Sequence, residues 1–181
     1  MKKIVEKVYN RLLLVLPDEL YLKVKFRQLM GKKLNLKNPQ TFSEKLQWLK
    51  LYDRRPEHTT MVDKYAVKDY VAKIIGDEYI IPTLGVWDRP EDIDWDSLPN
   101  QFVLKCTHDS GGLVICRDKS KLDKKAATTK LRKTLKQNYY RKWREWPYKN
   151  VPRRIIAEQY IEPAPDLKDL PEIGRASCRE R

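Results

Sequence analysis

A glycine-containing loop between two short apolar runs constrains the fold more than any other part of this chain. The stretch QFVLKCTHDSGGLVICRDKSK, residues 101–121, has one apolar run at 102–106 and a second at 113–116. Runs this short that are rich in Val, Ile and Phe are typical of β-strands, because helices need longer periodic segments. The sequence therefore predicts two strands joined by the loop THDSGG, residues 107–112.

Lys105 lies inside the first of these runs, where a charged side chain costs packing unless its ammonium group meets an anion. The loop adds possible phosphate donors, because glycines can turn N–H groups inward and hydroxyls can donate. These donors come from Thr107, Ser110, Gly111 and Gly112. A hairpin with a glycine-containing turn is the commoner explanation, so both interpretations stay open at this point.

The polar residues His108 and Asp109 lie in the same loop. A catalytic role is one interpretation, and shaping of the turn is the commoner one. Cys106 and Cys116 end the two runs, so we expect them close together as reduced, partly buried thiols. The odd total of three cysteines, without CxxC spacing, argues against a disulfide framework or a zinc site.

The other elements follow from periodicity and capping signals. Helices are expected at 2–16, 19–30, 60–75 and from Ser120/Asp123 to about Tyr140, and another begins at the Thr41/Glu44 capping box. The 60–75 helix should carry a broad apolar face and stop at Gly76. Residues 79–87 read as extended, residues 90–100 as a polar connection or short helix, and residues 153–162 as a strand. The fold class is α+β.

Charge is distributed unevenly along a chain whose formal net charge is +13. Fifteen Lys or Arg residues lie between Arg117 and Arg154, against only three acids. Such a segment attracts polyanions, although a solvated helix face explains it equally well. Its stretch YYRKWREWPYKN, residues 139–150, interleaves cations with aromatics and fits either an anionic partner or packing onto the domain.

No apolar run approaches the roughly 20 residues that span a bilayer. The run LLLVL at 12–16 is too short for a signal peptide and lacks a cleavage site, so we expect a cytoplasmic protein. The last ten residues, EIGRASCRER at 172–181, back-translate to a sequence that resembles a sequencing adaptor. We therefore expect native sequence to end near Pro171 and the parent protein to be longer.

Five stretches together resemble the ATP-grasp superfamily, and in particular its TupA-like branch, known from teichuronopeptide and other cell-surface polysaccharide biosynthesis. They are NPQTFSEKLQWLKLYDR, VDKYAVKDYV, IIPTLGVWD, LPNQFVLKCTHDSGG and RIIAEQYIE, and the resemblance covers residues 38–171. Taken alone, VDKYAVKDYV reads as an exposed helix face with ordinary ion pairs at Lys64 and Lys68, and the last stretch as a plain sheet strand.

The resemblance implies an ATP-dependent carboxylate–amine ligase with ATP and Mg²⁺ as cofactors. Lys64 and Lys105 would converge on the triphosphate, and the loop with Thr107, Ser110, Gly111 and Gly112 would close over it. The strand with Glu158, Gln159, Tyr160 and Ile161 would read the adenine edge, and Glu162 would hold the ribose. The Mg²⁺ ligands would lie after residue 171, so no metal ligand is assigned and the fragment is expected to be inactive.

The expected organisation is a helical region at 1–76, an extended acidic connection at 77–100, a partial ATP-grasp N-lobe at 101–171 and the adaptor-like tail. Partners would be ATP and an anionic cell-surface polymer precursor or amino-acid substrate; nucleic acid is not expected. Two alternatives remain. One is a glycosyltransferase of polysaccharide biosynthesis, although DID at 92–94 lies in a predicted surface connection and is no convincing metal motif. The other is a non-catalytic basic module that binds anionic polymer or nucleic acid.

Overall fold

Four antiparallel strands form the sheet of residues 11–162, the part of the chain that this computed structural model describes. They are β1 (Thr83–Trp87), β2 (Phe102–Cys106), β3 (Leu113–Cys116) and β4 (Ile155–Gln159), in the spatial order β1-β4-β2-β3. The two strands expected around the glycine loop are confirmed with the predicted bounds. The last of these four strands along the chain, β4, lies between β1 and β2.

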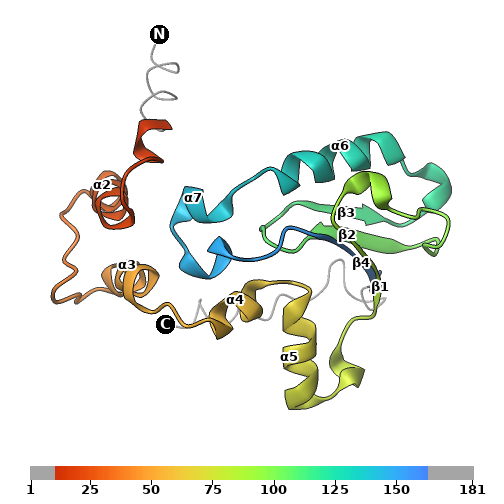
Figure 1. Ribbon diagram of the computed structural model, residues 1–181, viewed down its shortest axis with the longest axis horizontal. Helices are drawn as coiled ribbons and strands as arrows, with labels where there is room; N and C mark the ends of the chain where they lie inside the picture. Colours follow the sequence, from red (N-terminus) through yellow and green to blue (C-terminus); the bar gives the residue numbers. More distant parts are fainter. Residues whose placement is uncertain (1–10, 163–181) are drawn as a thin grey trace, which may run out of the picture.

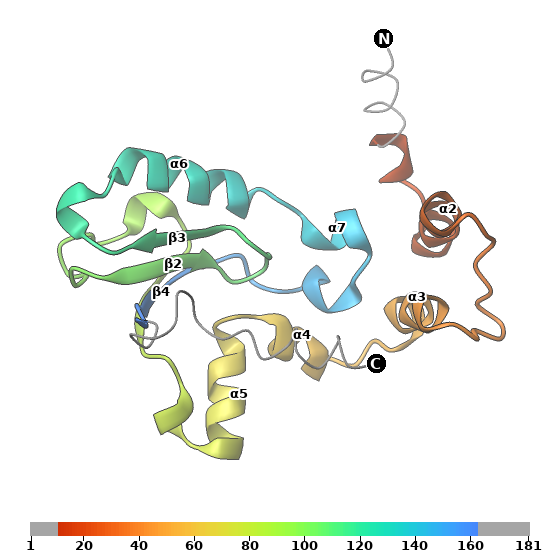
Figure 2. The same ribbon diagram turned by 180° about the vertical axis from the view of Figure 1, so that it is seen from behind.

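One face of the sheet packs beneath helix α6 (Lys124–Leu135), which covers it in both views (Figures 1 and 2). Alternation along β2 buries Phe102, Leu104 and Cys106 on this face. Ile155 and Ala157 of β4 and Leu131 of α6 complete the centre of this core. The opposite face carries Lys105 and is described with the candidate site.

The stretch 77–100, expected as a connection, contributes a strand to the same sheet. After a 3₁₀ turn, η1 (Asp77–Tyr79), strand β1 pairs with β4 in antiparallel register. A second 3₁₀ turn, η2 (Pro90–Asp92), follows, and Ile93 and Leu98 enter the sheet core. The acidic residues of this stretch therefore lie on a segment that is anchored to the sheet.

A second apolar core holds the N-terminal helices together. Helix α2 (Asp18–Met30) confirms the helix expected at 19–30, and it is followed by α3 (Phe42–Tyr52). The predicted capping box is present, because Thr41 Oγ1 accepts from the Glu44 N–H and the Glu44 carboxylate accepts from the Thr41 N–H at 2.9 Å. This core contains Leu13, Tyr21, Leu22, Phe26 and Leu34. Residues 2–10 of the expected first helix lie outside the described residues, as does the tail at 172–181.

The single helix expected at 60–75 is wrong, because two helices occupy this region. Helix α4 (Glu57–Val62) ends at Asp63, and α5 (Ala66–Ile75) begins after Tyr65 and stops at Gly76 as predicted. The carboxylate of Asp63 accepts the backbone N–H groups of Tyr65 and Ala66, which separates the two helices. Of the apolar residues expected along this helix, Met61, Ile74 and Ile75 are exposed.

The helix expected to run to about Tyr140 is also divided. Asp123 caps α6 through the Ala126 N–H at 2.8 Å, whereas Ser120 lies in a separate 3₁₀ turn, η3 (Lys119–Lys121). Helix α6 ends at Leu135, and Asn138 caps a new helix, α7 (Tyr139–Trp143). The 3₁₀ turn η4 (Trp146–Lys149) then leads to β4.

The two cysteines of the hairpin are not neighbours, which corrects the expectation that they lie close together. Cys106 is at the loop end of β2, whereas the register places Cys116 opposite Phe102 at the other end. Both are free and buried. Within the described residues no helix is both long enough and apolar enough to span a membrane.

Candidate functional site

Lys64 binds the glycine loop with both its backbone and its side chain. Its N–H donates to the Thr107 carbonyl at 3.2 Å, and its ammonium group donates to the Cys106 carbonyl at 2.8 Å. The ammonium group also contacts the carbonyl and the carboxylate of Asp109. Lys64 follows the break at Asp63, so the expectation that Lys64 and Lys68 share one helix is wrong. The break directs Lys64 at the loop.

Asp109 and the two glycines fix the shape of the loop. The Asp109 carboxylate accepts the Gly112 N–H at 3.0 Å. Gly111 has a φ of +90°, which favours glycine, and a Cβ on Gly112 would lie 2.2 Å from Asp109 Oδ2. The turn-shaping interpretation of Asp109 is confirmed. Ser110, at the tip of the loop, is exposed.

Thr107 is fully buried and faces the segment before β4. Its hydroxyl donates to the Pro152 carbonyl and accepts from the Arg154 N–H at 3.0 Å. Arg154 in turn pairs with Asp63 at 3.3 Å and lies over the ring of Tyr65. The Thr107 hydroxyl, which was expected to donate to a phosphate, is therefore hydrogen-bonded within the protein. Its partners are in the segment before β4, and Arg154 links that segment to Asp63 between α4 and α5.

His108 lies behind the loop rather than at its surface. Its Nε2 is 3.1 Å from the Gln137 carbonyl, which makes Nε2 the protonated nitrogen when the ring is neutral. Nδ1 is buried and has no hydrogen-bond partner among the described residues. Burial lowers the pKa of His108. Burial, with a contribution from the Asp109 carboxylate, raises the pKa of Cys106 to about 12, so this thiol is not a nucleophile at neutral pH.

Two lysines share one carboxylate on the face of the sheet opposite α6. Glu158 Oε1 accepts from Lys68 at 2.7 Å, and Glu158 Oε2 accepts from Lys105. Only 6% of the Glu158 side chain is exposed, against 26% for Lys105. The anion that Lys105 needs is thus Glu158 in this structure, and the cluster carries one net positive charge. Lys68, which was read as part of an exposed face, belongs to this cluster.

Apolar side chains surround that cluster on what we call the open face of the sheet. Register and alternation put Val103, Leu113, Ile115 and Ile156 on the same face as Lys105 and Glu158. Leu113 and Ile115, on the edge strand β3, are exposed, whereas Ile156 is fully buried. Exposed apolar residues beside a net positive charge suit a ligand with a flat apolar part and an anionic part.

The residues expected to hold the nucleoside lie at and after the end of β4. Glu158 has a neighbouring strand on either side, so its backbone lies within the sheet. The Gln159 N–H donates to the Pro82 carbonyl at 3.1 Å. Tyr160 accepts from Arg117 Nε at 3.1 Å, and the amide of Gln101 donates to Glu162 at 3.1 Å. Tyr160 and Ile161 follow the strand and are the candidates with backbone outside the ladder.

No group of three or more His, Cys, Asp or Glu residues suited to a metal ion occurs within residues 11–162. The acids nearest the lysines, Asp109 and Glu158, are already in ion pairs. The described residues therefore do not fit Mg²⁺. In the DID stretch, Asp92 pairs with Arg89, and Asp94 accepts the N–H groups of Asp96 and Ser97, so both carboxylates have local structural roles.

The basic and aromatic stretch 139–150 packs onto the molecule. The Arg144 guanidinium lies 4.4 Å from the centre of the Tyr21 ring, and Lys149 lies over Tyr140. Tyr139 and Tyr148 pack together with ring centres 4.7 Å apart. Of its two expected roles, packing onto the domain is the one observed.

The sequence reasoning missed Asp63, Lys68 and Arg154. The one available signal was the spacing of Lys64 and Lys68 beside Asp63, and no local pattern marked Arg154.

In a comparison with protein families, the family described as TupA-like ATPgrasp matches residues 44–171. The match begins at Glu44 of the capping box and includes the loop, the three-residue cluster and β4. Comparisons with curated proteins and with solved structures found no match.

Proposed function

The chain belongs to the TupA-like ATP-grasp family, and from this premise we propose that it acts as an ATP-dependent carboxylate–amine ligase in cell-surface polysaccharide or teichuronopeptide biosynthesis. Its substrates would be ATP, an anionic polymer precursor and an amine such as an amino acid. In this reaction a carboxylate oxygen attacks the γ-phosphorus and ADP leaves. The amine then attacks the acyl carbon, and phosphate leaves as the amide forms.

The cluster of Lys68, Lys105 and Glu158 is the observation that carries the proposal. Lys105 is partly exposed and held by a single carboxylate, so its ammonium group is available to a stronger anion that enters over the open face. A triphosphate carries more charge than Glu158 and would compete for Lys105. Lys64 would hold the loop with Ser110, Gly111 and Gly112 above the phosphates.

The nucleoside end of the ligand is proposed to lie at the end of β4. Backbone groups of Tyr160 and Ile161 would read the adenine edge, Gln159 would contribute beside them, and Glu162 would hold the ribose. ATP-grasp proteins generally use Mg²⁺ with ATP, and their acidic ligands are expected on strands after the adenine strand. Because residues 11–162 contain no group of acids suited to a metal ion, we expect this part of the chain to bind ATP without turnover.

Thermal unfolding with added ligands tests this function. ATP with Mg²⁺ should raise Tm, by about 2–4 °C for each kcal/mol of binding linkage, whereas a sugar nucleotide and duplex DNA should not. Lys105→Met should abolish the shift, and Lys133→Met, on the exposed side of α6, should preserve it. A shift with the sugar nucleotide alone, or one with DNA that weakens steeply with salt, would refute the ligase proposal.

Turnover is measured separately. ATP, Mg²⁺ and candidate acceptors should release no ADP when they are mixed with this chain. Steady ADP formation that Lys105→Met abolishes would contradict the expected inactivity while leaving the nucleotide site in place.

A further inference from the structure

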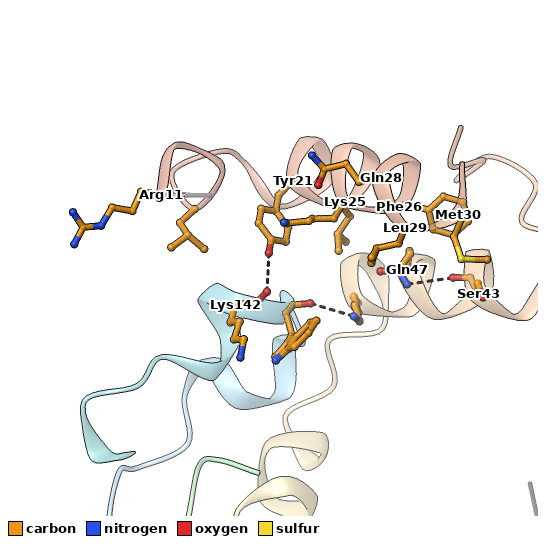
Figure 3. A pocket seen from close by; sticks show the side chains of 14 residues that line it. Arg11, Tyr21, Lys25, Phe26, Gln28, Leu29, Met30, Ser43, Gln47 and Lys142 are labelled. Carbon is orange, nitrogen blue, oxygen red and sulfur yellow. Dashed lines mark hydrogen bonds between the residues drawn. The ribbon is translucent and has the colours of Figure 1, made fainter. Parts of the chain in front are cut away.

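A large cavity is lined mainly by residues of α2, α3 and α7, and none of its lining residues belongs to the open face of the sheet (Figure 3). Its volume is about 1000 Å³, which is at the upper end of the range for small-molecule sites. The proposed nucleotide function uses none of its lining residues.

The lining is mainly apolar, and several of its side chains are open to solvent. Leu14, Leu22, Phe26, Leu29, Met30 and Trp143 contribute to it. Leu29 is 76% exposed at the C-terminal end of α2, and Met30 and Trp143 are also exposed. Apolar side chains gathered around a concave surface favour a hydrocarbon ligand.

The charges at this cavity all have one sign. Arg11, Lys25, Lys50 and Lys142 line it, and none of the described lining residues is acidic. The charge of Lys50 is partly compensated, because its ammonium group lies 3.8 Å from Glu145 and donates to the Trp143 carbonyl at 3.1 Å. Arg11 and Lys142 line the same end of the cavity as Tyr21, and the Lys142 ammonium group lies 5.2 Å from the centre of the Trp143 ring.

The cationic and apolar parts are separated along the cavity. Figure 3 shows Arg11, Tyr21 and Lys142 toward one end and Leu29, Met30 and Ser43 toward the other. Tyr21 and Leu29 are eight residues apart on α2, which corresponds to about 12 Å along a helix. A ligand with a charged head and a chain of that length would match both ends.

We propose that this cavity binds an amphiphilic anion, a hydrocarbon chain that ends in a phosphate or a carboxylate. The chain lies along Phe26, Leu29 and Met30, and the head meets the positive charge of Arg11 and Lys142. This binding needs no nucleotide, so it is tested without ATP, and its outcome is independent of the ligase proposal.

Titration of the full chain with decyl phosphate and with decanoate, below their micelle concentrations, tests the site. Both should bind in calorimetry, and both should change the fluorescence of Trp143, a change that Trp143→Phe removes. Each methylene removed from the chain should weaken binding by about threefold to fourfold. If only one of the two compounds binds, its head group identifies the ligand of this cavity as a phosphate or as a carboxylate. Decanol and decyltrimethylammonium should bind at least tenfold more weakly, and inorganic phosphate should not compete.

Two matched pairs of variants locate the ligand. Leu29→Glu should weaken decyl phosphate at least tenfold, whereas Leu20→Glu should not, because Leu20 is also exposed on α2 but lies outside the lining. Lys142→Gln should weaken the binding of decyl phosphate but not that of decanol, and Lys133→Gln should change neither affinity. Equal affinity for decanol and decyl phosphate, no binding of either anion, or a dimer that excludes them from the cavity would overturn the proposal.

Discussion

The imidazole of His108 is held neutral behind the glycine loop. Burial lowers its pKa, and its Nε2–H donates to the Gln137 carbonyl. The unfolded chain therefore binds a proton more readily than the folded protein does. The stabilisation is fully present above the unfolded pKa of about 6.5 and is lost as pH falls below that value.

Urea unfolding between pH 8 and pH 5 should show this dependence. We expect the free energy of unfolding to be constant above about pH 7 and to fall by up to about 1.4 kcal/mol per pH unit below pH 6.5. His108→Gln keeps an amide donor for the Gln137 carbonyl and should flatten the fall over this range. A wild-type profile as flat as that of the variant would contradict the assignment.

For Lys105, the sequence predicts that an anion lies nearby but not which residue supplies it. A lysine inside a β-run predicts a nearby anion, and that anion is present. Its identity did not follow from the sequence, because Glu158 is 53 residues away along the chain and becomes a neighbour only when β4 pairs with β2. The need for glycine in the loop could be predicted from the sequence, because it depends on the conformation of the loop itself and not on a distant segment.

At the scale of elements, the loop between β2 and β3 allows a matched pair of substitutions. A Cβ on Gly112 would lie 2.2 Å from Asp109 Oδ2 and 2.4 Å from Thr134 Cγ2, and both neighbours are buried. A Cβ on Gly111 would meet nothing within 4 Å, although its φ of +90° is unfavourable for alanine.

Gly112→Ala should therefore cost about 2–3 kcal/mol of unfolding free energy, through overpacking. Gly111→Ala should cost only about 1 kcal/mol, through backbone strain. Chemical denaturation of both variants measures the difference. A larger loss for Gly111→Ala than for Gly112→Ala would contradict the loop geometry.

The elements predicted best from the sequence are those with strong local signals. The β2 and β3 runs and the Thr41 capping box appear as expected. The prediction of one helix at 60–75 was wrong because the Asp63 side chain accepts a backbone N–H group and interrupts the helix. The ion pair that Asp63 makes with Arg154 could not be predicted, because Arg154 is distant along the chain. The end of α6 was missed although Asn138 is an ordinary N-cap residue.

At the scale of the whole molecule, Arg144 connects the end of α7 to the N-terminal apolar core. It is buried, has a φ of 54°, and donates to the carbonyls of Leu14 and Leu16 at 2.8 and 3.1 Å. It also pairs with Asp18 at 3.2 Å, and the Tyr21 hydroxyl donates to the Lys142 carbonyl nearby at 2.7 Å. These contacts join α7 to the start of α2.

Arg144→Ala should lower the free energy of unfolding by about 2–4 kcal/mol, because it leaves the Leu14 and Leu16 carbonyls without their donor and removes one of the two arginines that pair with Asp18. Hydrogen exchange should accelerate in α2 more than in β2. Arg141→Ala, an exposed position on the same helix, serves as the control and should have little effect. Equal acceleration in α2 and β2 would show that the two cores unfold as one unit.

The position of β4 determines when the sheet can be completed during synthesis. The hairpin of β2 and β3 can close as soon as it leaves the ribosome, because its contacts are local. About seventy residues separate β1 from β4, its neighbour in the sheet of residues 11–162, and an unpaired strand edge can pair with other chains. Nascent chains of this protein that stall before Ile155 are therefore the ones most dependent on chaperones.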